Sequence, residues 1–336
     1  MKKTLVAAAT LIAATGAFAQ SSVTLYGVVD ASLENVKGTD SLTRVSSDNY
    51  ASSRLGFRGV EDLGSGFKAK FVLESAVKVD TGANGGGSSR FFDRAAWVGL
   101  EGAYGELRLG RIDSSIGLLA GNSAILGAQA YDDLKIAKTF AGDTYRRVDN
   151  AITYVLPTLA AGLSAQIQYS TQVSGSELAD TDEGKAFGLN VQYAAGPFGA
   201  GLGFINAAES DEEDDQGVLV YASYDFGAAK LTGYYNQDDR DSEDEKRSLY
   251  GIKVGIPFST NFSLTAGVSK VSNVNFVKDA DATIIAIKGV YNLSKRTALY
   301  GLVTTIDNDE GSKLGLVATD SGKSSHGIAF GIRHSF

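Results

Sequence analysis

The stretch SHGIAFGIRHSF, residues 325–336, places its large apolar side chains on alternate positions. Ile328, Phe330, Ile332 and Phe336 share one parity, whereas the intervening positions hold glycine, alanine, arginine and serine. Successive side chains of an extended strand point to opposite faces of a sheet, so the pattern predicts a strand with one apolar face. A terminal strand of a soluble sheet more often runs on into polar residues, and the final aromatic residue therefore needs an explanation.

The same alternation recurs along the chain. In LSAQIQYS, residues 163–170, and in FGLNVQY, residues 187–193, apolar residues alternate with Ser, Gln, Asn or Gly. A face of amides and hydroxyls cannot line a dry core, because each unpaired polar group would cost about 2–7 kcal/mol. Clean alternation over about ten residues is typical of strands that have lipid on one face and water on the other.

Sixteen such segments are predicted. They lie near residues 22–34, 52–61, 66–77, 92–101, 104–111, 148–156, 163–170, 186–194, 198–206, 217–226, 229–236, 247–257, 261–269, 282–292, 296–305 and 326–336. An even number lets the sheet close, and closure is required because an open edge would leave unsatisfied backbone groups in hydrocarbon. The predicted fold class is all-β: a 16-stranded antiparallel transmembrane β-barrel.

Short and long connections alternate between these segments. Short turns lie near residues 63, 102, 158, 195, 227, 258 and 293, and long polar loops lie near 35–51, 78–91, 112–147, 171–185, 207–216, 237–246, 270–281 and 306–325. This asymmetry predicts short periplasmic turns and long external loops. Aromatic residues gather beside the short turns and predict an interfacial girdle: Phe67, Tyr104, Tyr193, Phe198, Phe226, Phe258, Phe262, Tyr291 and Phe336.

The chain begins with MKKTLVAAATLIAATGAFA, residues 1–19, which has the basic start, apolar run and small-x-small end of a secretory signal peptide. The predicted domains are therefore a signal peptide, 1–19, and a barrel, 20–336. Loss of two lysines with the signal would change the formal net charge from −8 to −10, which argues against nucleic acid as a partner. The sequence has no cysteine, so disulfides and thiolate chemistry are excluded.

Five motifs stand in order along the chain: SSVTLYGVVD (21–30), RLGFRGVEDLG (54–64), FDRAAWVGLEGAYGELRLGR (92–111), YNLSKRTALY (291–300) and GIRHSF (331–336). In them the chain resembles the general porins of Gram-negative bacteria, specifically the beta-proteobacterial and neisserial family. The resemblance implies an outer-membrane, water-filled diffusion channel for small hydrophilic solutes, usually a homotrimer, with the third external loop folded into the lumen. It also implies that Phe336 is read by the barrel-assembly machinery. The Pro-Glu-Phe-Gly loop motif of enterobacterial relatives is missing, which leaves the path of the third loop open.

Parity assigns charged side chains to the lumen. Leu55 and Phe57 face lipid, so Arg54 and Arg58 face water. The resemblance implies that Arg94 also belongs to the lumen wall. Guanidinium groups stay charged and bind carboxylate or phosphate well, so a basic stripe predicts a preference for small anions. The predicted anion pathway comprises Arg54, Arg58, Lys70, Arg94, Arg108, Arg146 and Arg147, with Asp132 and Asp133 opposite on the third loop. An open alternative is that these charges neutralise one another in ion pairs.

Acidic residues gather in the predicted external loops, as in ESDEEDD at 209–215. Such runs are usually solvated, but clustered carboxylates are also ligands for hard cations. No cofactor is expected, except that Ca²⁺ or Mg²⁺ could bind loosely at Asp211, Glu212, Glu213, Asp214 and Asp215 and bridge to outer-membrane lipopolysaccharide.

Other functions have less support. An enzyme would need a base beside a nucleophile, and the only histidines, His326 and His334, stand on the last strand with no serine-containing catalytic motif around them. A soluble secreted β-protein is also less favoured, because it would not be expected to repeat strands with one fully apolar face and one polar, hydrated face. The main alternative is a substrate-specific anion channel for phosphate or small organic acids, in which the basic stripe binds as well as filters.

Overall fold

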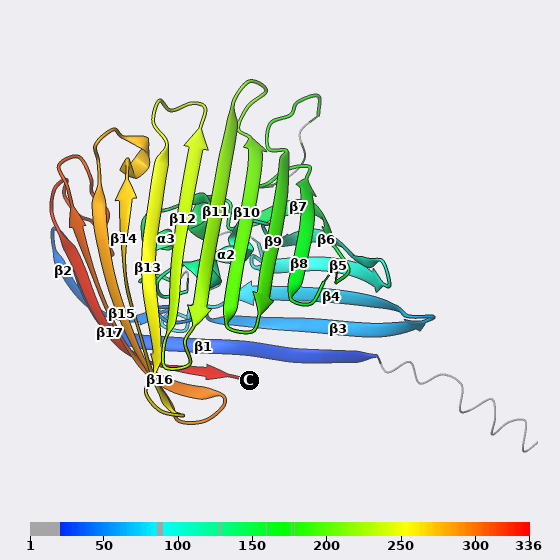
Figure 1. Ribbon diagram of the computed structural model, residues 1–336, viewed down its shortest axis with the longest axis horizontal. Coiled ribbons are helices and arrows are strands. Elements are labelled where there is room, and N and C mark those ends of the chain that lie inside the picture. The colour runs from blue at the N-terminus through cyan, green and yellow to red at the C-terminus, as the bar shows by residue number, and fades with distance from the viewer. Residues whose placement is uncertain (1–20, 86–89, 128, 159, 176, 178) are drawn as a thin grey trace, which may run out of the picture.

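The computed structural model describes residues 21–85, 90–127, 129–158, 160–175, 177 and 179–336; the predicted signal peptide, residues 1–19, lies outside the described residues. Over these ranges, seventeen strands form one antiparallel sheet that curves round and closes on itself (Figure 1). The strands are β1 (Ser22–Lys37), β2 (Ser41–Ser47), β3 (Arg54–Gly64), β4 (Phe67–Ala76), β5 (Ala95–Gly102), β6 (Gly105–Asp113), β7 (Arg147–Val155), β8 (Leu163–Ser170), β9 (Ala186–Ala195), β10 (Phe198–Ala208), β11 (Asp214–Asp225), β12 (Lys230–Arg240), β13 (Arg247–Pro257), β14 (Phe262–Ser272), β15 (Ala282–Asn292), β16 (Thr297–Asn308) and β17 (Ser325–Ser335).

These seventeen segments make a 16-stranded barrel, because β2 and β3 share one position in the wall. The C-terminal half of β1 pairs with β2, as at Leu33↔Val45, and its N-terminal half pairs with β3, as at Leu25↔Phe57. The prediction that residues 35–51 form only a loop was therefore wrong. SLTRVSS at 41–47 has no apolar alternation, and its extended form rests on the backbone ladder to β1.

The two ends of the described chain meet to close the wall. Strand β17 pairs with β1 over ten residue pairs, among them Leu33↔Phe330. Beyond the ladder, the Gly27 N–H donates to the Phe336 carbonyl and the Phe336 N–H donates to the Gly27 carbonyl, both at 3.1 Å. Phe336 thus lies at the seam between the first and last strands.

The two faces of the wall differ as the alternation predicts. In β8, Ile167 is 42% exposed and Tyr169 is similarly exposed on the outer face, whereas Gln168 is 2% exposed inside. Apolar residues outside and polar residues inside reverse the usual order of a soluble protein. All nine aromatic residues of the predicted girdle are exposed. No helix in the described part of the chain is long and apolar enough to cross a membrane.

The third long connection folds into the barrel. It carries α2 (Gly117–Ser123), α3 (Asp133–Ile136) and the π-helical turn η1 (Phe140–Thr144), and Figure 1 shows α2 and α3 inside the curved wall. Its apolar side chains Ile116, Leu119 and Phe140 are fully buried. Burial removes these apolar side chains of the longest loop from water, and the folded loop narrows the lumen. A further short helix, the 3₁₀ turn η2 (Val274–Phe276), lies between β14 and β15.

Polar contacts fix the inner loop to the wall at several points. The Tyr145 hydroxyl donates to Asp215 Oδ2 at 2.7 Å, and Asn190 Nδ2 donates to the Ser115 carbonyl at 2.8 Å. The Phe140 N–H donates to Asp238 Oδ2 at 3.1 Å. These partners come from β9, β11 and β12, so the loop is fixed to this part of the wall.

Candidate pore constriction

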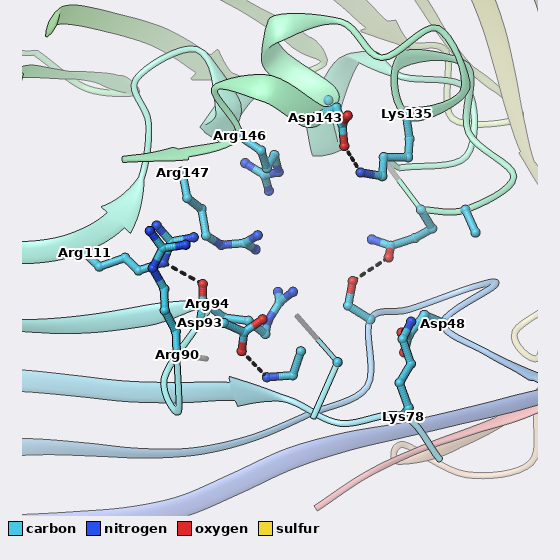
Figure 2. Close-up of a pocket in the computed structure, with 16 residues that line it drawn as sticks. Asp48, Lys78, Arg90, Asp93, Arg94, Arg111, Lys135, Asp143, Arg146 and Arg147 are labelled. Carbon is cyan, nitrogen blue, oxygen red and sulfur yellow. Dashed lines mark hydrogen bonds and ion pairs between the residues drawn. The ribbon is translucent and has the colours of Figure 1, made fainter. Parts of the chain in front are cut away.

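A cavity of about 400 Å³ lies between the inner loop and the facing wall (Figure 2). Its lining includes seven basic side chains, Lys78, Arg90, Arg94, Arg111, Lys135, Arg146 and Arg147, and three acidic ones, Asp48, Asp93 and Asp143. In Figure 2 the arginines gather on one side and the Lys78–Asp48 pair lies across from them. The cavity is therefore strongly charged and unevenly so.

Three carboxylates are each shared by two arginines. Glu74 accepts from Arg94 Nε at 2.7 Å and lies 3.5 Å from Arg54 Nε. Asp113 lies 3.1 Å from Arg147 Nε and 3.6 Å from an Arg146 nitrogen. Each guanidinium has five N–H donors in a fixed fork, so donors remain after these contacts.

The third shared carboxylate, Asp149, accepts from Arg90 at 2.6 Å and also from Arg111. Six guanidiniums against three carboxylates leave a formal excess of three positive charges. The Lys78–Asp48 and Lys135–Asp143 pairs are neutral, and Asp93 reduces the excess to two. Neutralisation by ion pairs is thus incomplete among the described residues.

Arg111 is a lumen residue that parity reasoning missed. It has the parity of the lipid-facing Leu107 and Leu109, which predicts an outward side chain. The pairing of β6 with β7 is irregular between Gly110 and Ile112, and Gly110 has φ +131°. A bulge breaks strict alternation and can redirect a side chain, and here Arg111 reaches Asp149 and the Asp93 carbonyl. A glycine before a charged residue at a strand end was the available signal.

The other missed cavity residues come from connections rather than strands. Lys78 and Arg90 belong to the loop between β4 and β5, and Lys135 belongs to α3 of the inner loop. Alternation carries no information in such segments, since it assigns a face only where the backbone is extended. Their positions depend on the path of each loop.

Of the seven predicted basic residues, the structure brings Arg94, Arg146 and Arg147 together at this cavity, with Arg54 beside Arg94 through Glu74. A neighbouring cavity of about 230 Å³ is lined by Arg94, Arg108 and Arg147. Arg94 and Arg147 therefore border both spaces.

Two predicted basic residues lie away from the charged cavity. The guanidinium of Arg58 is exposed and lies 5.2 Å from the centre of the Tyr26 ring. Lys70 pairs with Glu101 and lies 3.4 Å from Glu106. Both residues stand nearer to the short-turn ends of β3 and β4 than the arginine cluster does.

Asp132 and Asp133 do not line the charged cavity. Both are fully buried where the inner loop packs against the wall, and Asp133 Oδ2 accepts from the Tyr234 hydroxyl of β12 at 2.5 Å. The Ile125 N–H donates to Asp133 Oδ1 at 3.1 Å. Burial, followed by the adjacent Asp133, raises the pKa of Asp132 well above its usual range, which favours the protonated form. The pair holds the inner loop to β12.

The acidic run at 211–215 does not converge on one point. Asp211 accepts from the Thr181 hydroxyl at 2.6 Å, and this contact, with the Asp182 N–H, lowers the pKa of Asp211. Asp214 contacts Asn206, and Asp215 is buried between Arg240 and Tyr145. In the described residues no three His, Cys, Asp or Glu side chains form a metal-binding group. Loose Ca²⁺ or Mg²⁺ binding stays a prediction, which a chelator-dependent change in Tm would test.

Comparisons with known proteins agree with this geometry. Outer membrane porin protein 32 of Delftia acidovorans is 33% identical over the whole of both chains. A major outer membrane protein P.IB of Neisseria meningitidis is 25% identical, also over the whole of both. A solved structure described as the anion-selective porin from Comamonas acidovorans shares 31% identity and superposes with a TM-score of 0.83, covering 94% of this chain and all of its own.

The family model described as Gram-negative porin matches residues 4–311. Members of this family are outer-membrane channels rather than enzymes. From the closed barrel, the inward loop, the charged lumen and these matches, we conclude that the chain belongs to the Gram-negative porin family and resides in the outer membrane.

Proposed function

We propose that this porin is a general diffusion pore that passes small anions in preference to cations. The observation that carries the proposal is the sharing of Glu74, Asp113 and Asp149 by six arginines, which leaves the constriction with excess positive charge. Guanidinium does not lose its proton at any pH relevant to the cell. The preference is therefore expected to persist across physiological pH.

The carboxylates have a positioning role in this proposal. The side chains of Glu74 and Asp149 are 14% and 11% exposed, about as little as those of their partners Arg94 and Arg111 at 15% and 18%, so each carboxylate is packed against its arginines. Each holds two guanidinium groups in place against their mutual repulsion. A passing anion then meets oriented N–H donors, which cost little reorganisation.

The similarity to the anion-selective porin from Comamonas acidovorans supports the same preference here. Homotrimeric assembly, contact with lipopolysaccharide and insertion by the barrel-assembly machinery are parts of the proposal that follow from family membership. Chemical crosslinking of the detergent-extracted protein would test the trimer, which a purely monomeric pattern would contradict.

The central test is the reversal potential of the channel in a planar bilayer under a tenfold KCl gradient. An excess of about two unit charges near the path is expected to favour chloride over potassium by about an order of magnitude or more, since 1.4 kcal/mol corresponds to tenfold. A potential of the cation-selective sign would overturn the proposal. Conductance that saturates with one small anion, but not with others, would instead indicate a substrate-specific channel.

A further inference from the structure

A second cavity, of about 260 Å³, lies on the other side of the inner loop from the arginine cluster. It is enclosed by residues 121–127 of that loop and by the inner faces of β12, β13, β14 and β15. Its lining contains three lysines, Lys230, Lys253 and Lys288, and no acidic side chain among the described residues. We call these three residues the lysine triad.

The strand register explains why the triad converges. Lys253 pairs across β12 and β13 with Thr232, and Lys288 pairs across β14 and β15 with Thr265. Both threonines also line the cavity, so cationic and hydroxyl donors alternate along this wall. Lys230 is the first residue of β12, and all three lysines stand within a few residues of the short-turn ends of their strands. The triad therefore faces the periplasmic half of the lumen.

Two members of the triad are positioned by the inner loop. Lys253 Nζ donates to the Ala124 carbonyl at 2.6 Å, and Lys288 Nζ donates to the Leu126 carbonyl at 3.0 Å. An ammonium has three N–H donors, so each retains two after this contact. Lys230 is exposed and lines the cavity, and its ammonium makes no hydrogen bond or ion pair within the described residues.

The charge of the triad is poorly compensated. The acidic groups whose charges act on these lysines are Asp132, for Lys253 and Lys288, and Asp133, for Lys253; both are buried residues of the inner loop. Burial beside a second carboxylate favours the neutral form of Asp132. The described lining of the cavity therefore carries basic side chains with no carboxylate among them.

We propose that the lysine triad is a second anion-binding site, which takes small oxyanions, carboxylates or phosphate, on the periplasmic side of the inner loop. The volume is below the range of about 300–1,000 Å³ that is usual for drug-sized ligands, so it suits a small anion with some of its water. This inference rests on the proposed anion preference and extends it from one constriction to two sites in series.

A basic path joins the two sites along the wall. Arg333 of β17 lies near enough to Lys288 for their charges to interact, and it interacts in the same way with Arg54. Arg54 in turn lies beside Arg94 through Glu74. An anion that leaves the arginine cluster therefore meets further positive charge before it reaches the triad.

The alternative is that the lysines serve only to anchor the loop. Lys230 separates the two interpretations, because it lines the cavity without contacting the loop backbone. Lys230→Gln removes a charge and no loop contact, whereas Lys253→Gln removes a charge together with the ammonium that donates to the Ala124 carbonyl. Lys68→Gln is a matched control: Lys68 stands at the short-turn end of β4, pairs with Glu101 at 3.7 Å and lies outside the cavity.

The test is block of chloride conductance by inorganic phosphate, added separately to each side of single channels in a planar bilayer. In Lys230→Gln we expect the phosphate concentration for half block from one side to rise about fivefold, as removal of one charge at about 4 Å in a water-like medium implies. Arg147→Gln should change block from the opposite side, and Lys68→Gln should change neither.

The second site would be overturned if the phosphate concentration for half block, from either side, stayed unchanged both in Lys230→Gln and in the double variant with Lys253→Gln. Reversal potentials of the same channels keep this result separate from the proposed function. If the wild type prefers anions and phosphate blocks the variants as it blocks the wild type, only the inference about the lysine triad fails. If the wild type prefers cations, the proposed function fails first.

Discussion

Arg94→Gln tests the origin of anion preference at the arginine cluster, and Arg58→Gln is its matched control. Each change removes one guanidinium, from Arg94 directly before β5 or from Arg58 in β3, but only Arg94 lines the charged cavity. In Arg94→Gln the Glu74 carboxylate keeps Arg54 as a partner at 3.5 Å. The substitution therefore removes positive charge without leaving a buried carboxylate unpaired.

The expected magnitude follows from the excess of two unit charges at the cluster. One unit charge about 4–8 Å from a passing ion in a water-like medium is worth about 0.5–1 kcal/mol. Anion and cation respond in opposite directions, so the permeability ratio changes by about 1–2 kcal/mol, or about fivefold to thirtyfold. Screening at about 0.1 M salt moves the expectation to the lower end of this range.

The measurement is the zero-current potential of many channels under a KCl gradient, repeated at two mean salt concentrations. Arg94→Gln should lose about fivefold of its chloride-to-potassium ratio, with a larger loss at low salt, and Arg58→Gln should lose much less. Equal effects of the two variants would refute the reasoning, because they would show that total lumen charge, and not the local cluster, sets the preference.

Two further predictions concern the inner loop and the seam. Tyr234→Phe removes the hydroxyl that donates to Asp133 at 2.5 Å, which should weaken the attachment of the inner loop by about 1–3 kcal/mol and speed amide exchange over residues 131–137. Tyr235→Phe is the control, because its hydroxyl contacts Ser248 on the outer face and its loss should leave the exchange rate unchanged. Equal exchange rates in the two variants would count against the anchoring role of Tyr234. In Gly27→Ala, the new Cβ would lie 2.3 Å from Phe336 Cζ and 2.7 Å from the Arg54 carbonyl. We therefore expect the closed barrel to be destabilised by about 1–3 kcal/mol. The measurement is the midpoint temperature at which the fast-migrating band of folded protein disappears on gel electrophoresis, which should fall. Gly233→Ala, where a Cβ meets nothing within 4 Å, is the control, and identical midpoints would contradict the packing argument.

Alternation was sufficient for most of the wall. The predicted strand at 163–170 coincides with β8, and the apolar parity of β17 faces outward as expected. Strict alternation succeeds because a two-residue period, with lipid on one face and water on the other, constrains every position of a strand. The predicted alternation of short and long connections recurs between the strands, and the orientation inferred from it, with the short turns in the periplasm, stays a prediction.

Apolar alternation failed to predict the structure where the sequence does not alternate and where the strand backbone is irregular. Strand β2 lies within a stretch that carries no apolar alternation and is held by backbone bonds to β1. Arg111 has the parity of a lipid-facing residue and reaches the lumen through a bulge. Local irregularities of this kind change the direction of a side chain without changing the composition of the strand.

The sequence by itself determined the barrel, its closure and the basic character of the segments that contribute Arg54, Arg94, Arg108 and Arg147. Only the tertiary structure decided which charges share a cavity, that Asp132 and Asp133 of the inner loop are buried, and that the lysines of β12, β13 and β15 line one cavity with that loop. The physical reason is that strand periodicity specifies a face for each side chain, whereas the meeting of side chains from distant strands depends on register and on the path of the inner loop, which repeats no pattern.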